Sequence, residues 1–551
     1  MKKFWLKSYP TLVPKVFKES TSTLLDFFEE VFTQYKDLPM IESMGKKLSY
    51  NEVKKLSDKF AAYIQNITNL KSGDRVAIQM PNILQYPIVA IGCIKAGLVI
   101  VNINPLYTSY EMEKQLVDAK VKGIIILENF ASKLDSIISK INIENIFITR
   151  FGDFLGSFRG FFANFFIKYI KGIYSDHSIK KFISLKKIFI KKNLVYKKPL
   201  LSTSSIVSIQ YTGGTTGILK GAILSHKNIL ANIEQMCHWI GYRVKKGEEV
   251  VMTALPLYHI FSFSLNFLTS MKIGARNILI PNPRDMNSFL KSIKNKKVSI
   301  ITGVNTLFDS MMKNENFSKV DFSNLKITIS GGMNLSKSIS EKWKNLTGND
   351  IVETYGLTEA SPAAIGSPFD GTHRNGSIGL PIPGTDIKIL DDKNLSVDIG
   401  TPGNLFIKGP QVMKGYWRNK EETKKVLVDG WLNTGDIAVM DADGFITIVD
   451  RKKELINISG FNVFPSEIEN VISMHSGVEE VAVTGFHYSE LRDDIFAFVV
   501  KKDEDLTERN VLNHCRKYLT NYKIPHKIIF VDALPKSPLG KVLKRLLEKP
   551  M

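Results

Sequence analysis

Strand-like and helix-like segments alternate along most of this 551-residue chain, and the alternation leaves few folds open. Residues 49–52 form a capping box ahead of apolar residues at helical spacing, and residues 75–78 are strand-like. An apolar helix is expected near residues 88–96 and another strand at residues 99–101. The alternation returns from residue 205 to about residue 387. It predicts α/β sheets covered by helices.

The pattern changes twice more toward the C-terminus. Residues 386–449 carry short strands separated by glycine and aspartate turns, which predicts a small β-rich subdomain. After Lys453 strands and helices mix, and a second capping box is expected at residues 466–469. We therefore expect a large N-terminal domain of several subdomains over residues 1–452 and a separate α+β domain over residues 453–551.

Composition excludes several classes of protein. Hydrophobic residues are 44% and charged residues 23% of the chain, values typical of a globular protein. The three cysteines lie far apart, so neither a zinc site nor a disulfide scaffold is expected. We find no secretory signal and no run of about 18 uncharged apolar residues that could span a membrane. These features predict a cytoplasmic protein with free thiols.

Basic residues exceed acidic residues by 20, which directs attention to nucleic acid, anionic membranes or phosphorylated ligands. Compositional drift explains much of this surplus more simply, because the lysines are scattered among isoleucine and asparagine. Residues 151–192 are different, since phenylalanines crowd there beside lysines. This segment is typical of a helix on an anionic bilayer, such as the cytoplasmic face of the inner membrane, or of a peripheral helix that packs its phenylalanines onto the domain.

A loop rich in glycine and threonine lies between two strand-like stretches, residues 206–210 and 222–224. Its glycines let backbone N–H groups turn toward one oxyanion, and its hydroxyls and lysine add donors and charge. The spacing matches neither GxxxxGK[ST] nor GxGxxG. The loop predicts a polyphosphate site, with a ligand-free glycine hairpin as the alternative. Its candidate residues are Thr212, Gly213, Gly214, Thr215, Thr216, Gly217 and Lys220.

A second cluster spans residues 353–359. Tyr355 could stack on a base with Gly356 beside it, and Thr358 could donate to a phosphate. Glu359 could hold Mg²⁺ together with substrate oxygens. A helix N-terminus with an acidic first turn explains the pattern about as well.

Two further motifs are weaker when taken alone. Asp436 ends a tight turn after Trp431, where it could bind vicinal ribose hydroxyls or serve as an ordinary turn residue. Lys541 stands on a proline- and glycine-rich loop ahead of an expected basic amphipathic helix. The helix dipole disfavours a lysine there unless an anionic substrate faces it. A solvated lysine in a basic tail is the alternative.

These motifs, together and in this order, resemble those of the adenylate-forming superfamily of acyl-CoA synthetases, luciferases and peptide-synthetase adenylation domains. Within it the chain is similar to bacterial long-chain fatty-acid–CoA ligases, on residues 100–107, 409–417 and 430–469. The resemblance covers essentially the whole chain. It implies that ATP activates a long-chain fatty acid as acyl-AMP with release of pyrophosphate, and that coenzyme A then takes the acyl group and releases AMP.

The resemblance also implies roles for single residues. It implies that the glycine–threonine loop and Lys220 bind the β- and γ-phosphates, and that Tyr355, Gly356 and Gly332 lie at the adenine. Asp436 and Arg451 would bind the ribose, Thr358 a phosphate, and Glu359 the Mg²⁺ ion. Lys541 would neutralise charge at the reacting atoms.

A moving C-terminal domain is a further implication. Lys453 matches the family hinge, so one pose would deliver Lys541 and another would open a pantetheine path past Gly460. His259 and Phe263 match the segment that lines the carboxylate end of the acyl pocket. A lone histidine on an apolar segment is also typical of a satisfied core residue.

Some positions depart from the family pattern, and some questions stay open. The departures are at Met333, Asn404, His487 and Arg492, and they concern loop packing and the efficiency of the thioester step. A medium-chain or aryl carboxylate–CoA ligase is one alternative. A basic non-catalytic protein that binds membrane or nucleic acid is another, but the ordered motifs disfavour it, so no nucleic-acid partner is expected. The sequence leaves chain-length preference and a homodimer open.

Overall fold

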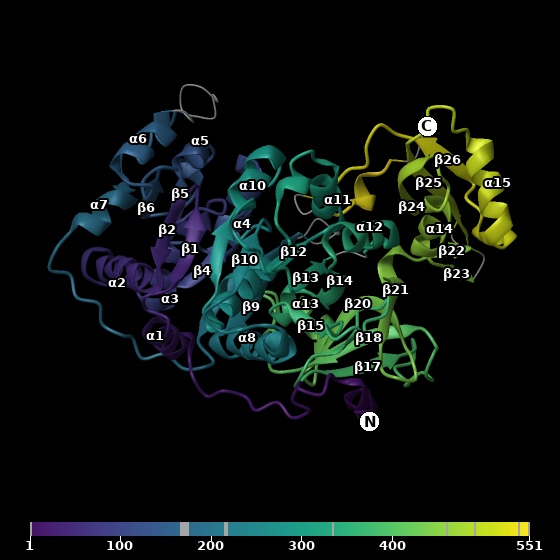
Figure 1. Ribbon diagram of the computed structural model, residues 1–551, viewed down its shortest axis with the longest axis horizontal. Coiled ribbons are helices and arrows are strands. Elements are labelled where there is room, and N and C mark those ends of the chain that lie inside the picture. Colours follow the sequence, from purple (N-terminus) through teal and green to yellow (C-terminus); the bar gives the residue numbers. More distant parts are fainter. Residues whose placement is uncertain are drawn as a thin grey trace.

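The structure, a computed structural model, describes residues 3–165, 176–213, 219–332, 335–458, 461–489, 492–537 and 540–548. Two large sheets, a small antiparallel sheet and a C-terminal sheet follow one another along the molecule (Figure 1). The predicted α/β class is confirmed, and so is the β-rich character of residues 386–449.

The first large sheet has its strands in the order β7-β6-β5-β3-β4-β8-β9. Its strands pair in parallel except β8 with β9, which form an antiparallel hairpin. The hairpin was predicted from the stretches on either side of the glycine–threonine loop. The bounds are β3 (Arg75–Gln79), β4 (Val99–Asn102), β5 (Gly123–Leu127), β6 (Asn145–Thr149), β7 (Ile183–Ser184), β8 (Ile206–Gly213) and β9 (Leu219–Ser225).

The second large sheet has the order β16-β15-β14-β13-β12-β10-β11-β1-β2. The six central strands, β14, β13, β12, β10, β11 and β1, pair in parallel with their neighbours. The edge strands β2, β15 and β16 pair antiparallel. The bounds are β1 (Pro39–Ser43), β2 (Lys46–Ser49), β10 (Val250–Thr253), β11 (Arg276–Leu279), β12 (Ile300–Gly303), β13 (Ile327–Gly331), β14 (Ile351–Gly356), β15 (Ala363–Gly366) and β16 (Leu380–Pro381).

Two buried helices join these sheets into one core. Every residue of α3 (Gln85–Lys95) is buried, as expected of a helix that is apolar on all sides. α8 (His226–Ile240) is buried along most of its length and belongs, with α3 and residues of both sheets, to one hydrophobic cluster. The capping box predicted at the start of α2 (Tyr50–Ile67) is confirmed, because Ser49 Oγ accepts from the Glu52 N–H at 3.2 Å.

The small sheet and the C-terminal sheet complete the fold. The small antiparallel sheet contains β17 (Asp386–Leu390), β18 (Gly403–Lys408), β19 (Leu427–Val428), β20 (Trp431–Met440) and β21 (Ile446–Arg451). The C-terminal sheet contains β22 (Ile456–Ile458), β23 (Phe461–Val463), β24 (Val478–Ser489), β25 (Arg492–Lys501) and β26 (Lys527–Phe530), with α14 (Pro465–Ser473) and α15 (Glu508–Tyr518) packed on it.

The C-terminal sheet has hydrophobic clusters of its own, built only from residues between Ile456 and Leu547. Figure 1 places it at the opposite end of the molecule from α6 (Ser157–Phe165). A separate core is what a domain that moves as a unit requires. The boundary at residues 452–453 stays a prediction.

Two predictions for this C-terminal part are wrong. The capping box at residues 466–469 is absent, because Pro465 occupies the first turn of α14 and the Ser466 hydroxyl donates instead to the Val449 carbonyl at 2.6 Å. No basic amphipathic helix follows Lys541 within residues 540–548; a short 3₁₀ turn, η11 (Lys544–Leu546), stands there. Its Lys544 pairs with Glu469 at 2.7 Å, so tertiary contacts decide the local structure.

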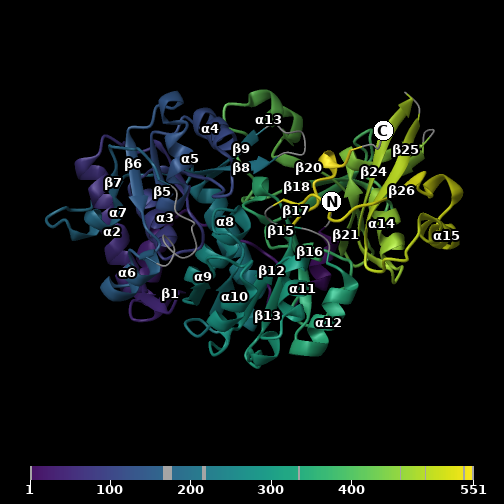
Figure 2. The same ribbon diagram turned by 90° about the horizontal axis from the view of Figure 1, so that it is seen from above.

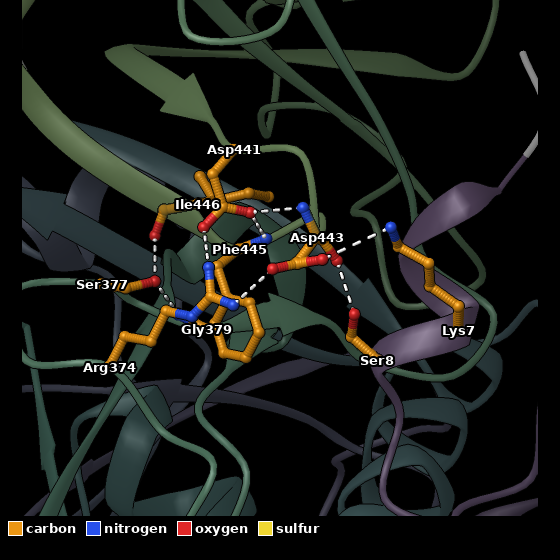
Figure 3. Close-up of polar contacts among 9 residues, drawn as sticks. All are labelled: Lys7, Ser8, Arg374, Ser377, Gly379, Asp441, Asp443, Phe445 and Ile446. Atoms are coloured by element: carbon orange, nitrogen blue, oxygen red, sulfur yellow. Dashed lines mark hydrogen bonds and ion pairs between the residues drawn. The ribbon is translucent and has the colours of Figure 1, made fainter.

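The N-terminal segment lies against the small sheet (Figure 3). η1 (Phe4–Ser8) brings Lys7 Nζ to 3.3 Å from Asp443 Oδ1, and the Ser8 hydroxyl donates to the Asp443 carbonyl at 2.8 Å. Arg374, from the loop before β16, donates to the same carboxylate at 2.6 Å. The turn between β20 and β21 is thus held by two distant segments.

Residues 151–192 are partly described. The four phenylalanines of α6 are 47–77% exposed: Phe158, Phe161, Phe162 and Phe165. Outside α6, Phe154 packs its ring on Phe189 at 5.1 Å between ring centres. Among the described residues no helix is both long and apolar enough to cross a membrane.

Candidate functional site

Three of the predicted site residues come together between the second large sheet and the small sheet. Tyr355 is the penultimate residue of β14, and its hydroxyl donates to Asp436 Oδ2 at 2.5 Å. Asp436 pairs in register with Arg451 across β20 and β21, and Arg451 Nε lies 3.4 Å from Asp436 Oδ1. The sequence prediction that these three residues belong to one site is consistent with this geometry.

Burial and the Asp436 charge raise the pKa of the Tyr355 hydroxyl well above its ordinary value, so the hydroxyl remains a donor. Asp436 is itself only 6% exposed, and its carboxylate is shared between the phenol and the guanidinium. A buried carboxylate fixed in this way is a ready acceptor for hydroxyl groups of a ligand.

Gly356 is required by the close approach of two backbone segments. A Cβ at this position would overlap the Pro362 carbonyl, to which the Leu357 N–H donates at 3.0 Å. Any side chain would therefore push apart the strand end that carries Tyr355. Gly332, directly after β13, has φ +82°, and among the described residues no atom lies within 4 Å of the Cβ it lacks.

Glu359 lies on a 3₁₀ turn, η8 (Thr358–Ala360), rather than at the start of an α-helix. Its Oε1 accepts from the Tyr416 hydroxyl at 2.7 Å. Among the described residues no group of three or more His, Cys, Asp or Glu side chains could hold a metal ion. This arrangement still fits Mg²⁺, which binds through one or two carboxylates together with phosphate oxygens.

Lys220 lies near the start of β9, directly after the glycine–threonine loop. Its Nζ is 2.5 Å from Glu422 Oε2, on α13 (Lys420–Val426), and 5.5 Å from the centre of the Tyr416 ring. The hydroxyl of Thr212, on the paired strand β8, donates to the Lys220 carbonyl at 3.4 Å. Gly213 ends β8.

Five predicted residues lie outside the described parts of the chain: Gly214, Thr215, Thr216 and Gly217 of the loop, and Gly460. Met333 is also outside them. The Asn404 side chain, another departure from the family pattern, donates to the Leu390 carbonyl at 3.2 Å, which is a role in packing the small sheet.

Lys541 approaches this cluster from the C-terminal domain. Burial first, and then the Arg451 charge, lowers the pKa of its ammonium to about 8, while Glu454 and Asp436 act in the opposite direction. The preceding Gly540 has φ +82°, and a Cβ there would lie 2.7 Å from Thr306 Oγ1 at the start of α11 (Asn305–Lys313). The terminal loop is therefore seated on the large domain, with Lys541 near enough to Asp436 and Arg451 for both charges to act on its ammonium.

Lys453 lies at the junction of the two domains, in the 3₁₀ turn η9 (Lys452–Glu454) that follows β21. Burial, with the Arg451 charge next in size, lowers the pKa of its ammonium. The charge of Arg451 therefore lowers the pKa of both Lys453 and Lys541. An anionic ligand bound there would offset this repulsion.

The residues predicted for the acyl pocket follow β10 in the chain. His259 is partly exposed, accepts from the Phe261 N–H at 3.3 Å through Nδ1, and is kept neutral because burial lowers its pKa to about 4. Phe263 is fully buried in η6, a π-helix (Ser262–Thr269), and packs on Phe267.

Sequence reasoning missed three residues of the site: Tyr416, Glu422 and Thr306. Tyr416 lies in a stretch already noted for its resemblance to a family, but nothing in that stretch indicates that its hydroxyl reaches Glu359. Glu422 and Lys220 are 202 residues apart, and only the folded chain brings them together.

Comparisons with known proteins indicate a family. The family models described as AMP-binding enzyme and AMP-binding enzyme C-terminal domain match residues 28–417 and 467–541. The chain is 45% identical to the long-chain-fatty-acid–CoA ligase of Yersinia pestis, over 99% of this chain and 97% of that protein. It is 35% identical to the corresponding ligase of Bacillus subtilis, over 98% and 97%.

Solved structures are also similar. ATP-bound MatB from Rhodopseudomonas palustris has a TM-score of 0.81 and 27% identity, covering 94% of this chain and 97% of MatB. The anthranilate CoA ligase AuaEII in complex with anthranoyl-AMP has a TM-score of 0.82 at 23% identity, covering 98% and 97%, which shows the shared fold.

Proposed function

The chain belongs to the AMP-binding enzyme family, and from that premise we propose that it is a long-chain fatty-acid–CoA ligase. The observation that carries the proposal is the convergence of Tyr355, Asp436, Arg451 and Lys541 in a chain that is similar over its full length to ligases of that kind. The aryl and medium-chain alternatives and the non-catalytic alternative have no comparable support.

The reaction has two steps. In the first, a carboxylate oxygen of the fatty acid attacks the α-phosphorus of ATP, and the bond to the leaving pyrophosphate breaks. In the second, the thiol sulfur of coenzyme A attacks the acyl carbon of the acyl-AMP, the thiol proton is lost, and AMP leaves. Neither step needs a covalent enzyme intermediate, which agrees with free cysteines: Cys93 and Cys515 are buried, and burial raises the pKa of the Cys237 thiol to about 12.

Nucleotide binding is proposed for the cluster between the sheets. Asp436 would accept from the ribose hydroxyls with Arg451 beside it, and Tyr355 would lie against adenine with Gly356 and Gly332. The glycine–threonine loop and Lys220 would hold the β- and γ-phosphates, and Thr358 would donate to a phosphate. Mg²⁺ held by Glu359 and phosphate oxygens would supply neutralisation of phosphate charge.

Lys541 is proposed to stabilise the first transition state. Its ammonium would lie between the attacking carboxylate and the phosphorus, where negative charge gathers. The hinge at Lys453 would then carry the domain of residues 453–551 to a second pose, in which coenzyme A reaches the acyl group past Gly460. The seating of Gly540 on Thr306 supports the first pose.

A carboxylate panel tests the function. Purified protein with ATP and Mg²⁺ should exchange labelled pyrophosphate into ATP in the presence of palmitate or oleate, and should release AMP when coenzyme A is added. Exchange with benzoate or octanoate and none with palmitate would contradict the long-chain assignment. His259→Ala and Phe263→Ala should then raise the KM for the fatty acid more than the KM for ATP.

Contact with an anionic membrane is proposed for the exposed face of α6, because its four phenylalanines are uncovered. Replacing Phe158 and Phe161 with serine should abolish flotation with anionic liposomes at low salt. Absence of flotation by the unmodified protein would refute the contact. Light scattering on the same protein would test the homodimer that the sequence leaves open.

A further inference from the structure

Lys220, the cation that the proposed function places at the phosphates, is already paired in this structure. Its Nζ lies 2.5 Å from Glu422 Oε2, and its side chain also faces the Tyr416 ring. The side chains of Lys220 and Glu422 are 19% and 25% exposed, so solvent and salt screen the pair only in part. An ammonium and a carboxylate at this separation form a charge-assisted hydrogen bond.

The backbone around α13 puts Glu422 in this position. The Trp417 N–H donates to the Gly221 carbonyl at 2.7 Å, so the segment before α13 follows the edge of β9. Asn419 then caps α13 by accepting from the Glu422 N–H at 3.0 Å. Figure 2 shows α13 beside β8 and β9. The first turn of the helix therefore faces the strand that carries Lys220.

We propose that Glu422 is an internal counter-anion for Lys220. The phosphates of ATP displace the Glu422 carboxylate from Lys220 when they bind, and the carboxylate pairs with Lys220 again when pyrophosphate leaves. The inference rests on the proposed function, since it requires ATP at Lys220. A carboxylate that competes for the ammonium weakens the binding of phosphate oxygens and shortens the time that pyrophosphate remains bound. Glu422 is thus a positioning residue that favours turnover over affinity.

Neutralising this carboxylate without changing its shape tests the idea. In Glu422→Gln, the dissociation constant of pyrophosphate and the KM for ATP should each fall about three- to tenfold, because Lys220 loses its competitor. Release of pyrophosphate should slow in a pre-steady-state assay. Glu422→Asp keeps the charge and should stay nearer to the wild type.

The neighbouring residue offers a matched control. Glu421 lies on the same turn of α13, but its carboxylate is 3.9 Å from Lys424 rather than near Lys220. Glu421→Gln removes the same charge and should leave pyrophosphate binding and the KM for ATP unchanged. In a Lys220→Met background, Glu422→Gln should have no further effect.

Other outcomes would overturn the inference. A higher KM for ATP in Glu422→Gln would mean that Glu422 holds Lys220 for the phosphates instead of competing with them. Equal changes in the KM for ATP in Glu421→Gln and Glu422→Gln would show that the effect comes from the net charge of the protein and not from the pair with Lys220. Failure of the proposed nucleotide site looks different, because the wild-type protein would then bind neither ATP nor pyrophosphate.

Discussion

At the scale of single residues, loss of Lys541 should affect the two half-reactions differently. Lys541→Ala should slow acyl-AMP formation on the order of 10²–10³-fold, because one donor to developing charge is lost. Transfer from supplied acyl-AMP to coenzyme A should change little, since the proposed second pose does not use this lysine. Single-turnover assays of each step measure the split.

Lys536→Ala is the control for this experiment. Lys536 lies on the same terminal loop, but its ammonium pairs with Glu480 on β24. It should leave both steps near the wild-type rates. Equal losses in both steps for Lys541→Ala would contradict the model of two poses.

The same ammonium predicts a pH dependence. With a pKa near 8, Lys541 is charged below that pH and loses its charge as pH rises through it. The kcat/KM for ATP in acyl-AMP formation should therefore fall above about pH 8. Lys541→Arg stays charged in this range, so in that variant the fall should disappear. A fall that persists in Lys541→Arg would assign the titration to another group.

At the scale of elements, the sequence predicts what local rules decide and misses what distant contacts decide. The Ser49 cap and the β8–β9 hairpin follow from neighbouring residues, and both are present. The helix expected after Lys541 is replaced by a short turn because Leu547 packs into the C-terminal core and Lys544 pairs with Glu469. Its local sequence gave no sign of these partners.

The same distinction applies to the candidate site. Motifs located Tyr355, Asp436 and Lys541, because each stands in a short segment of recognisable chemistry. The contact of Tyr416 with Glu359 depends on the packing of one loop against another, so no local pattern could have indicated it.

The docking of the N-terminal segment gives an element-scale prediction. Gly444, in the turn between β20 and β21, has φ +90°, and a Cβ there would overlap Trp5 of η1. Gly444→Ala should lose about 2–4 kcal/mol of local stability, from backbone strain and displacement of η1. The apparent Tm should fall, and proteases should cleave the N-terminal segment faster.

Gly400→Ala separates the two causes. Gly400 has a similar φ of +84°, but nothing lies within 4 Å of its missing Cβ. It should therefore show the strain alone, about 1 kcal/mol, with normal protease resistance. If the two variants behaved alike, η1 would not be docked on the turn in solution.

At the scale of the whole molecule, an exposed ion pair allows a test of the balance between the two proposed poses. Lys313 of α11 lies 3.1 Å from Glu479 of β24, so the pair joins the large domain to the C-terminal domain in the pose that brings Lys541 to the site. Glu479→Lys replaces attraction with repulsion in this pose alone. Because both side chains are about half exposed, the effect should be small, about two- to fivefold.

The direction of that effect depends on the step. Glu479→Lys should slow acyl-AMP formation and leave thioester formation from supplied acyl-AMP unchanged or faster, since the second pose gains population. High salt should erase the difference, because screening weakens exposed charge pairs. Lys313→Glu in the same chain should restore part of the first rate, although Asp309 lies 2.8 Å from Lys313 and limits the recovery. A loss that is equal in both steps and insensitive to salt would show that the contact has no part in the exchange between poses.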